Sequence, residues 1–437
     1  MKIAFLTAFF FVMNTVSAQN KAVEEKNIES KAIKLNDTSL IKKFYQISHQ
    51  RLFWFAQNNS SQQLRAVFKD IIDSAANIGL NKANYHYEEI EKYADDFLIS
   101  SDSDSLLKTD MIFTDAAITF SKDVFHGAGI SSWVNSDAIS PKYAEENDRY
   151  ILNKLSQANS DSLLEQFISS LEPKELGYQI LKQKLKEQIQ NHSDDTIRQL
   201  SLSLNLFRWI RHFNVKEYIV VNIASATLRY YQDDALKLTM KVVVGKPSTR
   251  TPRFAAYCNE IVLYPYWNVP HKIAVNELLP IARKSPDVLE LMNMQVLDNK
   301  GSVLDMNKIN WKTFNKNNFP YRFRQSTGCD NALGVIKFNL TSPYDVYMHD
   351  TNLKSAFQSG YRYYSHGCIR VEKPIELGNY LLDNKLDSSF LQSCLKNQVS
   401  IPVTLGRKIP VFVIYTPVEI DDSGKVRYYK DIYRLFR

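Results

Sequence analysis

The spacing of the hydrophobic residues changes once along this chain, near Glu217, and this change constrains the fold more than any other feature. Upstream, apolar residues such as Leu64, Phe68 and Ile71 recur at three- and four-residue steps, as one buried helix face requires. Downstream, β-branched and aromatic runs such as residues 218–223 are separated by turn residues. The sequence therefore predicts a multidomain α+β protein, with an all-α domain followed by a mostly β domain.

The length of 437 residues also indicates more than one domain, because a single hydrophobic core rarely organises so long a chain. Hydrophobic residues at 44% and charged residues at 23% are typical of a globular protein and exclude a disordered one. We predict a helical domain at 39–215, a mostly β domain at 216–405 and C-terminal strands packed on it at 406–437.

One stretch interrupts the β domain. Residues 271–323 are mostly helical and polar in pattern, and two large aromatic residues, Tyr266 and Trp267, stand at their entrance. Long insertions between strands of an enzyme often cover or clamp a substrate. We interpret this stretch as a helical lid.

The N-terminus has the pattern of an export signal. Lys2 is followed by a short apolar run, and Val16, Ser17 and Ala18 supply the small residues of a cleavage site. We predict a signal peptide at 1–18, a linker at 19–38 and a periplasmic protein. An uncleaved membrane anchor is the alternative.

The formal net charge of +7 is compatible with an anionic partner. However, the basic residues are spread along the chain among acidic ones, and no nucleic-acid-binding motif occurs. We predict a mildly basic surface and no nucleic-acid partner.

A reactive cysteine, Cys368, lies in the run Tyr-Ser-His-Gly-Cys-Ile-Arg-Val. A thiol with an ordinary pKa of about 8.5 is mostly protonated at neutral pH, so it needs a base, and histidine is the usual one. His366 adjoins the cysteine and His349 lies upstream. Gly367 allows close backbone approach to a developing oxyanion, and Arg370 offers a fork for a carboxylate. The pattern predicts a cysteine acyl-transfer site.

The upstream histidine lies in a predicted strand. Because side chains alternate between faces, Val346 and Met348 share one face, while Tyr347 and His349 share the other. With the apolar pair in the core, Tyr347 and His349 face a cleft together. An ordinary strand histidine is the alternative.

The other cysteines are Cys258, Cys329 and Cys394. If Cys368 stays free, at most one bridge forms among these three, and no spacing selects a pair. No Cys-x-x-Cys motif occurs, and a disulfide scaffold is not expected.

The order of His349, the Ser-His-Gly-Cys run and Arg370 resembles the catalytic domain of the L,D-transpeptidase family. Other blocks resemble the longer Gram-negative branch of that family, which carries a helical scaffold: 240–247, 251–252, 264–270 and 331–334.

This resemblance implies peptidoglycan chemistry without a cofactor or metal. Cys368 would attack the third residue of a tetrapeptide stem, release the terminal D-alanine and pass the thioester to an amine of another stem, giving a 3→3 cross-link. His349 would act as the base, and the backbone near Asp350 would help to orient it. The amides of Gly367 and Cys368, with the Tyr347 hydroxyl, would bind the oxyanion. The resemblance also implies covalent inhibition by carbapenem β-lactams. The residues predicted to contact the substrate are Tyr347, Ser365, His366, Arg370, Tyr266 and Trp267.

Two features depart from the family pattern. Where many relatives carry Pro-Gly-Pro, this chain has Thr327, Gly328 and Cys329, which places another thiol near the site in sequence. No trace of the usual peptidoglycan-binding module is found in the helical half.

Three other readings remain open. An L,D-carboxypeptidase or cross-link hydrolase would use the same thioester with water as the acceptor. A zinc site would use His349, His366 and Cys368, although no acidic base or metal-ligand spacing supports it. A wall-binding protein would keep the fold without catalysis.

Overall fold

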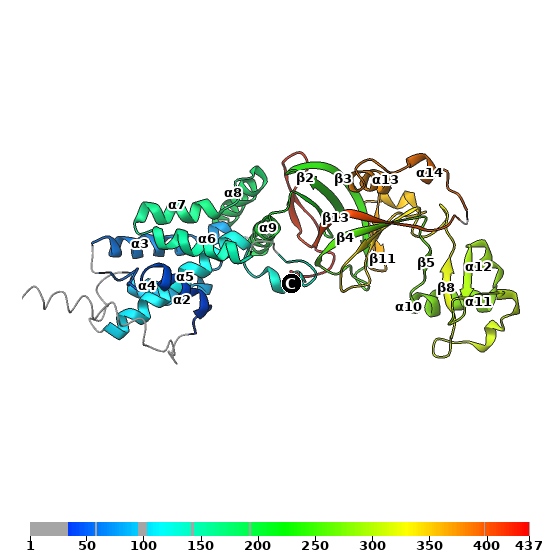
Figure 1. Ribbon diagram of the computed structural model, residues 1–437, viewed down its shortest axis with the longest axis horizontal. Helices are drawn as coiled ribbons and strands as arrows, with labels where there is room; N and C mark the ends of the chain where they lie inside the picture. Colours follow the sequence, from blue (N-terminus) through cyan, green and yellow to red (C-terminus); the bar gives the residue numbers. More distant parts are fainter. Residues whose placement is uncertain are drawn as a thin grey trace, which may run out of the picture.

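The structure is a computed structural model. It describes residues 34–56, 59–94, 103–140, 144–191, 194–396 and 398–436. Three bodies lie in a row along the long axis: a helical body, a β domain and a smaller inserted body (Figure 1). The predicted signal peptide lies outside the described residues. No helix within these ranges is long and apolar enough to cross a membrane.

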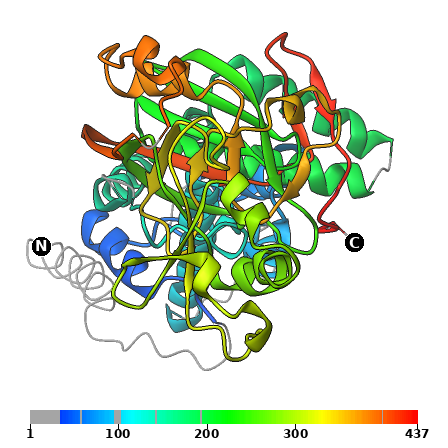
Figure 2. The same ribbon diagram turned by 90° about the vertical axis from the view of Figure 1, so that its right-hand side faces the viewer.

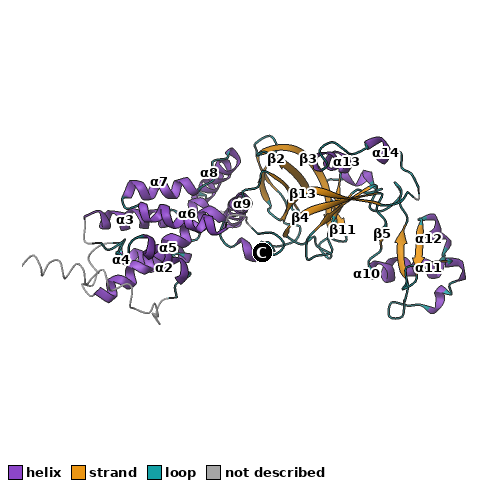
Figure 3. Ribbon diagram, in the orientation of Figure 1, coloured by secondary structure: helices purple, strands orange, loops and turns teal. Residues whose placement is uncertain are grey.

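The helical body has its own hydrophobic core, in which aromatic side chains such as Trp54, Phe68 and Phe113 are fully buried. Helices gather at this end of the molecule and strands in the middle (Figure 3). The α-helices of this body are α2 (Thr38–Ile47), α3 (Asn59–Asp73), α4 (Tyr87–Tyr93), α5 (Ser103–His126), α6 (Ala144–Gln157), α7 (Asp161–Leu171), α8 (Leu176–Gln190) and α9 (Asp194–His212).

The β domain is built on a nine-stranded sheet in the order β11-β3-β12-β10-β9-β4-β13-β1-β2, within the described residues. An additional β2–β3 pairing closes the ladder into a ring. Its strands are β1 (Glu217–Asn222), β2 (Thr227–Gln232), β3 (Ala235–Gly245), β4 (Phe254–Leu263), β9 (Ile336–Leu340), β10 (Met348–His349), β11 (Tyr363–Ser365), β12 (Ile369–Val371) and β13 (Ile401–Ile414).

The predicted division after residue 405 is wrong. β13 is one strand that runs across this position and pairs with both β1 and β4, so the C-terminal residues complete the main sheet. In the sequence, Gly406 and the two basic residues after it suggest the end of a strand. In the structure they lie within β13, whose pairing with β4 shifts in register between Thr404 and Ile409. The C-terminal residues also form an antiparallel hairpin of β14 (Val418–Ile420) and β15 (Val426–Tyr428).

The inserted body contains helices, as predicted, but also a four-stranded sheet in the order β5-β8-β6-β7 that the sequence analysis missed. Strands this short show too few alternations to be recognised from sequence. The body has its own core around Trp311 and Phe323, and it lies in front of the β domain when viewed from its end (Figure 2). Its elements are β5 (Trp267–Asn268), α10 (His271–Ile273), α11 (Leu279–Lys284), α12 (Asp287–Leu291), β6 (Met294–Leu297), β7 (Val303–Leu304) and β8 (Arg322–Gln325).

The helical body and the β domain share a packed junction. On α9, Trp209 contacts Phe412 of β13 with ring centroids 5.4 Å apart. The backbone at Asn135 pairs with Phe254 at the start of β4. The C-terminal tail closes the junction, where the ring of Phe436 lies 5.5 Å from that of Trp133. Apolar packing and backbone hydrogen bonds therefore join the two bodies.

Candidate active site

A tight turn carries the candidate nucleophile, Cys368. The Ser365 hydroxyl donates to the Cys368 carbonyl oxygen at 2.7 Å and accepts from the Gly367 amide at 3.1 Å. Gly367 has φ +123°, a conformation that favours glycine. From behind, the Thr251 hydroxyl donates to the Gly367 carbonyl at 2.7 Å. Ser365 is 2% exposed, so the structure places it within the turn, where its hydroxyl is already bonded.

Parallel pairing of β10 with β12 brings the histidine to the cysteine. His349 is in register with Arg370, and the Ile369 amide donates to the Tyr347 carbonyl at 3.1 Å. Since side chains alternate along both strands, Cys368 lies on the same face as Arg370 and next to Tyr347.

The predicted alternation on β10 is confirmed. Val346 and Met348 are buried in the main core, while the rings of Tyr347 and His349 lie 5.6 Å apart on the other face. The strand therefore presents these two rings together, on the face to which its partner strand brings the cysteine.

A backbone contact sets the tautomer of His349. Its Nδ1 lies 2.5 Å from the Asp350 carbonyl oxygen. A carbonyl oxygen only accepts, so Nδ1 carries the proton and Nε2 keeps its lone pair. No hydrogen bond joins Cys368 to His349 in this arrangement, and Cys368 Sγ lies 3.8 Å from the Asp345 carbonyl oxygen instead.

The electrostatics of the site favour the uncharged forms of His349 and Cys368, which we call the neutral pair. Burial, followed by the charge of Arg370, lowers the pKa of His349 to about 3. Burial also raises the pKa of Cys368, and hydrogen bonds from Tyr347 and the charges of Lys337 and Arg370 offset this only in part. At neutral pH the resting site therefore holds a thiol and an uncharged imidazole.

We expect the alkylation rate of Cys368 by iodoacetamide to keep rising above pH 9, without a plateau near neutrality. The raised pKa of its thiol leaves little thiolate at pH 7, so each increase in pH exposes more nucleophile. The measurement uses Cys258→Ala, in which Cys368 is the single free thiol of the described chain. An apparent thiol pKa below 7 would contradict the neutral pair.

The block at residues 331–334 supports the histidine through Asp350. The Asp350 carboxylate accepts from the Val335 amide at 3.0 Å and pairs with Lys354. Gly334 has φ +58°, and a Cβ there would lie 2.6 Å from the Asp350 Cβ and closer still to its carboxylate. Glycine at 334 thus lets Asp350 occupy the position from which its carbonyl holds the imidazole.

Gly334→Ala is expected to lower the free energy of unfolding by about 2–4 kcal/mol, because steric overlap with Asp350 adds to backbone strain. Urea denaturation measures this change. Gly360→Ala is the matched control, since a Cβ there meets no atom within 4 Å, and it should change stability by less than about 0.5 kcal/mol. Equal effects at the two glycines would refute this account of position 334.

His366 points to the inserted body. Its Nε2 lies 2.9 Å from Glu277 Oε1, which connects the catalytic turn to the insertion. His366 is therefore not assembled with His349 and Cys368 as a zinc site would require. No group of three or more His, Cys, Asp or Glu residues suited to a metal occurs in the described parts of the chain.

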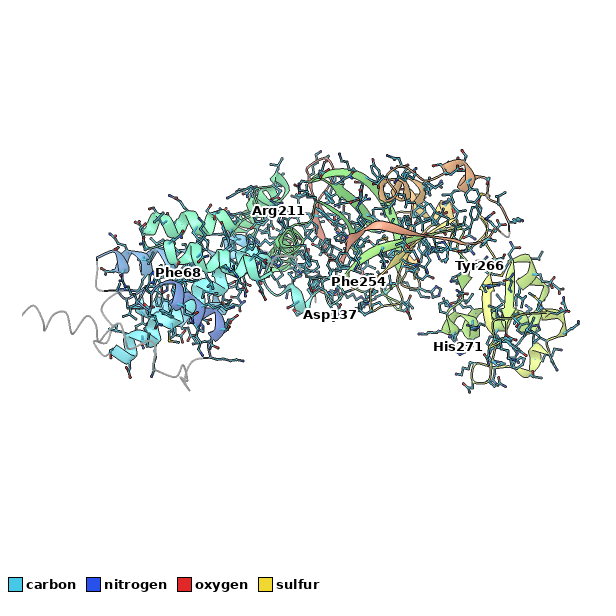
Figure 4. The ribbon with its side chains drawn as sticks, in the orientation of Figure 1. Phe68, Asp137, Arg211, Phe254, Tyr266 and His271 are labelled. Carbon is cyan, nitrogen blue, oxygen red and sulfur yellow. A yellow bond between two sulfur atoms is a disulfide. The ribbon has the colours of Figure 1, made fainter. Side chains whose placement is uncertain are left out.

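Tyr266 and Trp267 lie at the neck between the β domain and the insertion. Figure 4 shows Tyr266 there, with His271 on the insertion side. The Arg324 guanidinium covers the Tyr266 ring at 4.6 Å, and Trp267 packs against the core of the insertion. No contact joins either ring to Cys368, so their predicted role in substrate binding stays a prediction.

The segment that departs from the family pattern, residues 327–329, is held by a disulfide bond. Cys329 forms a disulfide with Cys394, while Cys258 is buried and free. The bridge ties the loop before β9 to the segment after α14 (Ser388–Gln392). Cys368 keeps a free thiol.

Sequence analysis missed Lys337 and Glu277. Lys337 on β9 is in register with His349, and its Nζ lies 4.2 Å from the Tyr347 ring centroid. Lys337 could have been predicted to face the site, because a lysine between Ile336 and Phe338 indicates the polar face of this strand. Nothing in the local pattern distinguishes Glu277 from other acidic residues of the insertion.

The chain matches two known domain families. Residues 216–420 match the L,D-transpeptidase catalytic domain, and residues 39–185 match a scaffold domain. A protein of Haemophilus influenzae named "Putative L,D-transpeptidase" is 34% identical over 307 residues, which are 69% of this chain and 61% of that relative. The matched region thus spans less than two thirds of the relative.

Solved structures with some likeness include an L,D-transpeptidase from Mycobacterium smegmatis, 18% identical, with a TM-score of 0.23, 45% of this chain covered and 58% of that chain. L,D-transpeptidase 3 from Mycobacterium tuberculosis in complex with a faropenem-derived adduct is 14% identical, with a TM-score of 0.23 and coverage of 46% and 60%. Because these TM-scores are low, the assignment of the domains rests on the sequence matches alone. Residues 216–420 of this chain are therefore an L,D-transpeptidase catalytic domain, preceded by a scaffold domain at residues 39–185.

Proposed function

We propose that this protein forms 3→3 peptidoglycan cross-links through a thioester on Cys368 and releases D-alanine from tetrapeptide stems. The observation that carries the proposal is the parallel β10–β12 pairing, which brings a free thiol and an imidazole with an unprotonated Nε2 to one face of the sheet. The match to the L,D-transpeptidase catalytic domain suggests the class of reaction.

The first half-reaction begins with a proton transfer. Rotation of the Cys368 side chain away from the Asp345 carbonyl brings Sγ to Nε2 of His349, which takes the thiol proton. The thiolate attacks the carbonyl carbon of the third stem residue, so a carbon–sulfur bond forms. His349 then returns the proton to the departing amine of D-alanine as the carbon–nitrogen bond breaks.

The oxyanion of this step needs donors. The Gly367 amide already donates to the Ser365 hydroxyl, so we assign the oxyanion to the Cys368 amide and the Tyr347 hydroxyl. Removing one such donor typically costs about 3 kcal/mol of transition-state stabilisation. Gly367 then contributes by its backbone conformation rather than by its amide.

Two cations flank the nucleophile. Lys337 and Arg370 both contribute favourable charge to a Cys368 thiolate, and Arg370 Nε is buried without a hydrogen-bond partner. These groups are suited to a stem carboxylate and stabilise the transient thiolate. In the second half-reaction, an acceptor amine attacks the thioester, His349 takes its proton, and Cys368 is released as a thiol.

The assay that tests the proposal incubates the purified protein with disaccharide-tetrapeptides and analyses the products by mass spectrometry. Dimers together with free D-alanine are expected. Tripeptide monomers alone would instead indicate an L,D-carboxypeptidase, and the absence of any product would contradict both activities.

We also propose that carbapenems acylate Cys368. The strained lactam carbonyl presents the same electrophile as the stem peptide, and ring opening leaves an acyl group on sulfur.

Export to the periplasm is part of the proposal. The apolar run after Lys2 and the small residues at 16–18 support it. N-terminal sequencing of the protein from cells is expected to begin at Gln19, and an intact Met1 would contradict cleavage there.

A further inference from the structure

A cavity lies at the junction of the helical body and the β domain, and none of the residues proposed for catalysis lines it. Its volume is about 420 Å³, within the range of small-ligand sites. Its walls come from residues 131–137, residues 250–253, Tyr344 and the C-terminal tail. We call this cavity the junction pocket. Figure 4 shows one of its residues, Asp137, near Phe254.

Hydrogen bonds between distant parts of the chain build the walls. The Asn135 amide donates to the Arg253 carbonyl at 3.2 Å, and the Tyr433 hydroxyl donates to the Gly245 carbonyl at 2.6 Å. The Thr251 amide donates to the Tyr433 hydroxyl at 3.1 Å. The pocket is thus preformed by the folded junction.

The charges of the pocket are unbalanced. Two arginines, Arg250 and Arg253, line it with a single acidic residue, Asp137. Neither guanidinium is paired with a carboxylate among the described residues. The charge of Arg250 adds to burial in lowering the pKa of Arg253, so the two cations lie close enough to repel each other.

Each guanidinium group lies against an aromatic ring and keeps N–H groups that donate no hydrogen bond. Arg253 lies over the Trp133 ring at 4.0 Å, and its Nη1 is buried without a hydrogen-bond partner. Arg250 lies 5.5 Å from the Tyr433 ring centroid and donates from Nε to the Pro247 carbonyl at 3.3 Å. Stacking on an aromatic face leaves the in-plane N–H groups of a guanidinium available to an oxyanion.

We propose that the junction pocket binds a small ligand carrying carboxylate or phosphate oxyanions, with Arg253 and Arg250 as the binding groups. Such an anion would offset the charges of the two guanidinium groups that line the pocket and relieve the repulsion between them. Because Thr251 lines the pocket and also holds the Gly367 carbonyl, the ligand would sit behind the catalytic turn. This site is separate from Arg370 and does not rest on the proposed function.

Isothermal titration calorimetry with the full chain at low salt tests the proposal. Glutarate is the probe for a carboxylate ligand and inorganic phosphate the probe for a phosphoryl group. We expect saturable binding of at least one probe. Arg253→Gln should weaken it about tenfold or more, since a charge-assisted hydrogen bond is lost. Asp137→Asn should tighten it severalfold, because it removes the one negative charge of the pocket.

The controls separate this site from general charge effects. Arg198→Gln removes a positive charge from an exposed ion pair on α9 and should leave affinity unchanged. Arg370→Gln should also leave it unchanged, because Arg370 lies in the active site. The tighter probe identifies the chemistry of the ligand. The proposal would be overturned if neither probe bound saturably, or if Arg253→Gln and Arg198→Gln weakened binding equally. Weaker binding by Asp137→Asn would overturn it as well.

Discussion

Cys368→Ala is expected to abolish cross-link formation, with a loss of at least about 10⁴-fold, because the attacking atom is removed and the histidine has nothing to activate. The fold should tolerate the change. Cys368 is half-buried, and the polar contacts of its sulfur, with the Asp345 carbonyl at 3.8 Å and with Tyr347, are weak ones, so the free energy of unfolding should fall by less than about 1 kcal/mol. Product analysis by mass spectrometry and urea denaturation measure the two quantities.

The other free thiol provides the matched control. Cys258 is fully buried on β4, and burial raises the pKa of its thiol to about 12. Incubation with a carbapenem should add one inhibitor mass to the wild type and to Cys258→Ala, and none to Cys368→Ala. An adduct that persists in Cys368→Ala would show that acylation occurs elsewhere and would remove the basis of the mechanism.

His349→Gln is expected to lower the rate of Cys368 acylation by about 10²–10⁴-fold, the usual contribution of a positioned base. With an imidazole pKa of about 3, the wild-type base stays unprotonated throughout the neutral range. Removing it should therefore lower the acylation rate at every pH near 7. The residual rate should rise with pH, because hydroxide then ionises the thiol. Stopped-flow kinetics with a carbapenem across pH 6–10 measures both effects.

His366 tests which histidine is the base. His366→Gln breaks the contact with Glu277 but leaves the His349 Nδ1 hydrogen bond in place, so we expect a loss of about tenfold or less. Losses of equal size in the two variants would contradict the assignment of the base to His349. A pH profile that changes only in His366→Gln would contradict it as well.

The chain order of the motifs was enough to recognise the L,D-transpeptidase catalytic domain and to select a candidate nucleophile. Hydrophobic periodicity located both main domains, and alternation along β10 correctly paired Tyr347 with His349, because both are local properties of the chain. The same local reasoning failed where elements were short or irregular. It missed the strands of the insertion and divided β13, whose irregular register resembles a break in the sequence.

Residues far apart in sequence became partners only through tertiary structure. Lys337 reaches Tyr347 through pairing between strands, and Glu277 reaches His366 from the insertion. The Cys329–Cys394 bridge spans 65 residues and had no distinguishing spacing.

The sequence by itself determined the type of each domain, the match to the L,D-transpeptidase catalytic domain and the candidate nucleophile Cys368, because periodicity and motif order are properties of residues close together in the chain. The tertiary structure decided the state of that thiol and the existence of the junction pocket. Burial depends on every chain segment packed around a group, and a cavity depends on surfaces from several segments. Burial favours the uncharged forms of Cys368 and His349. Arg250 and Arg253 are close neighbours in the chain, but only the folded junction encloses them in a cavity with a single acidic residue.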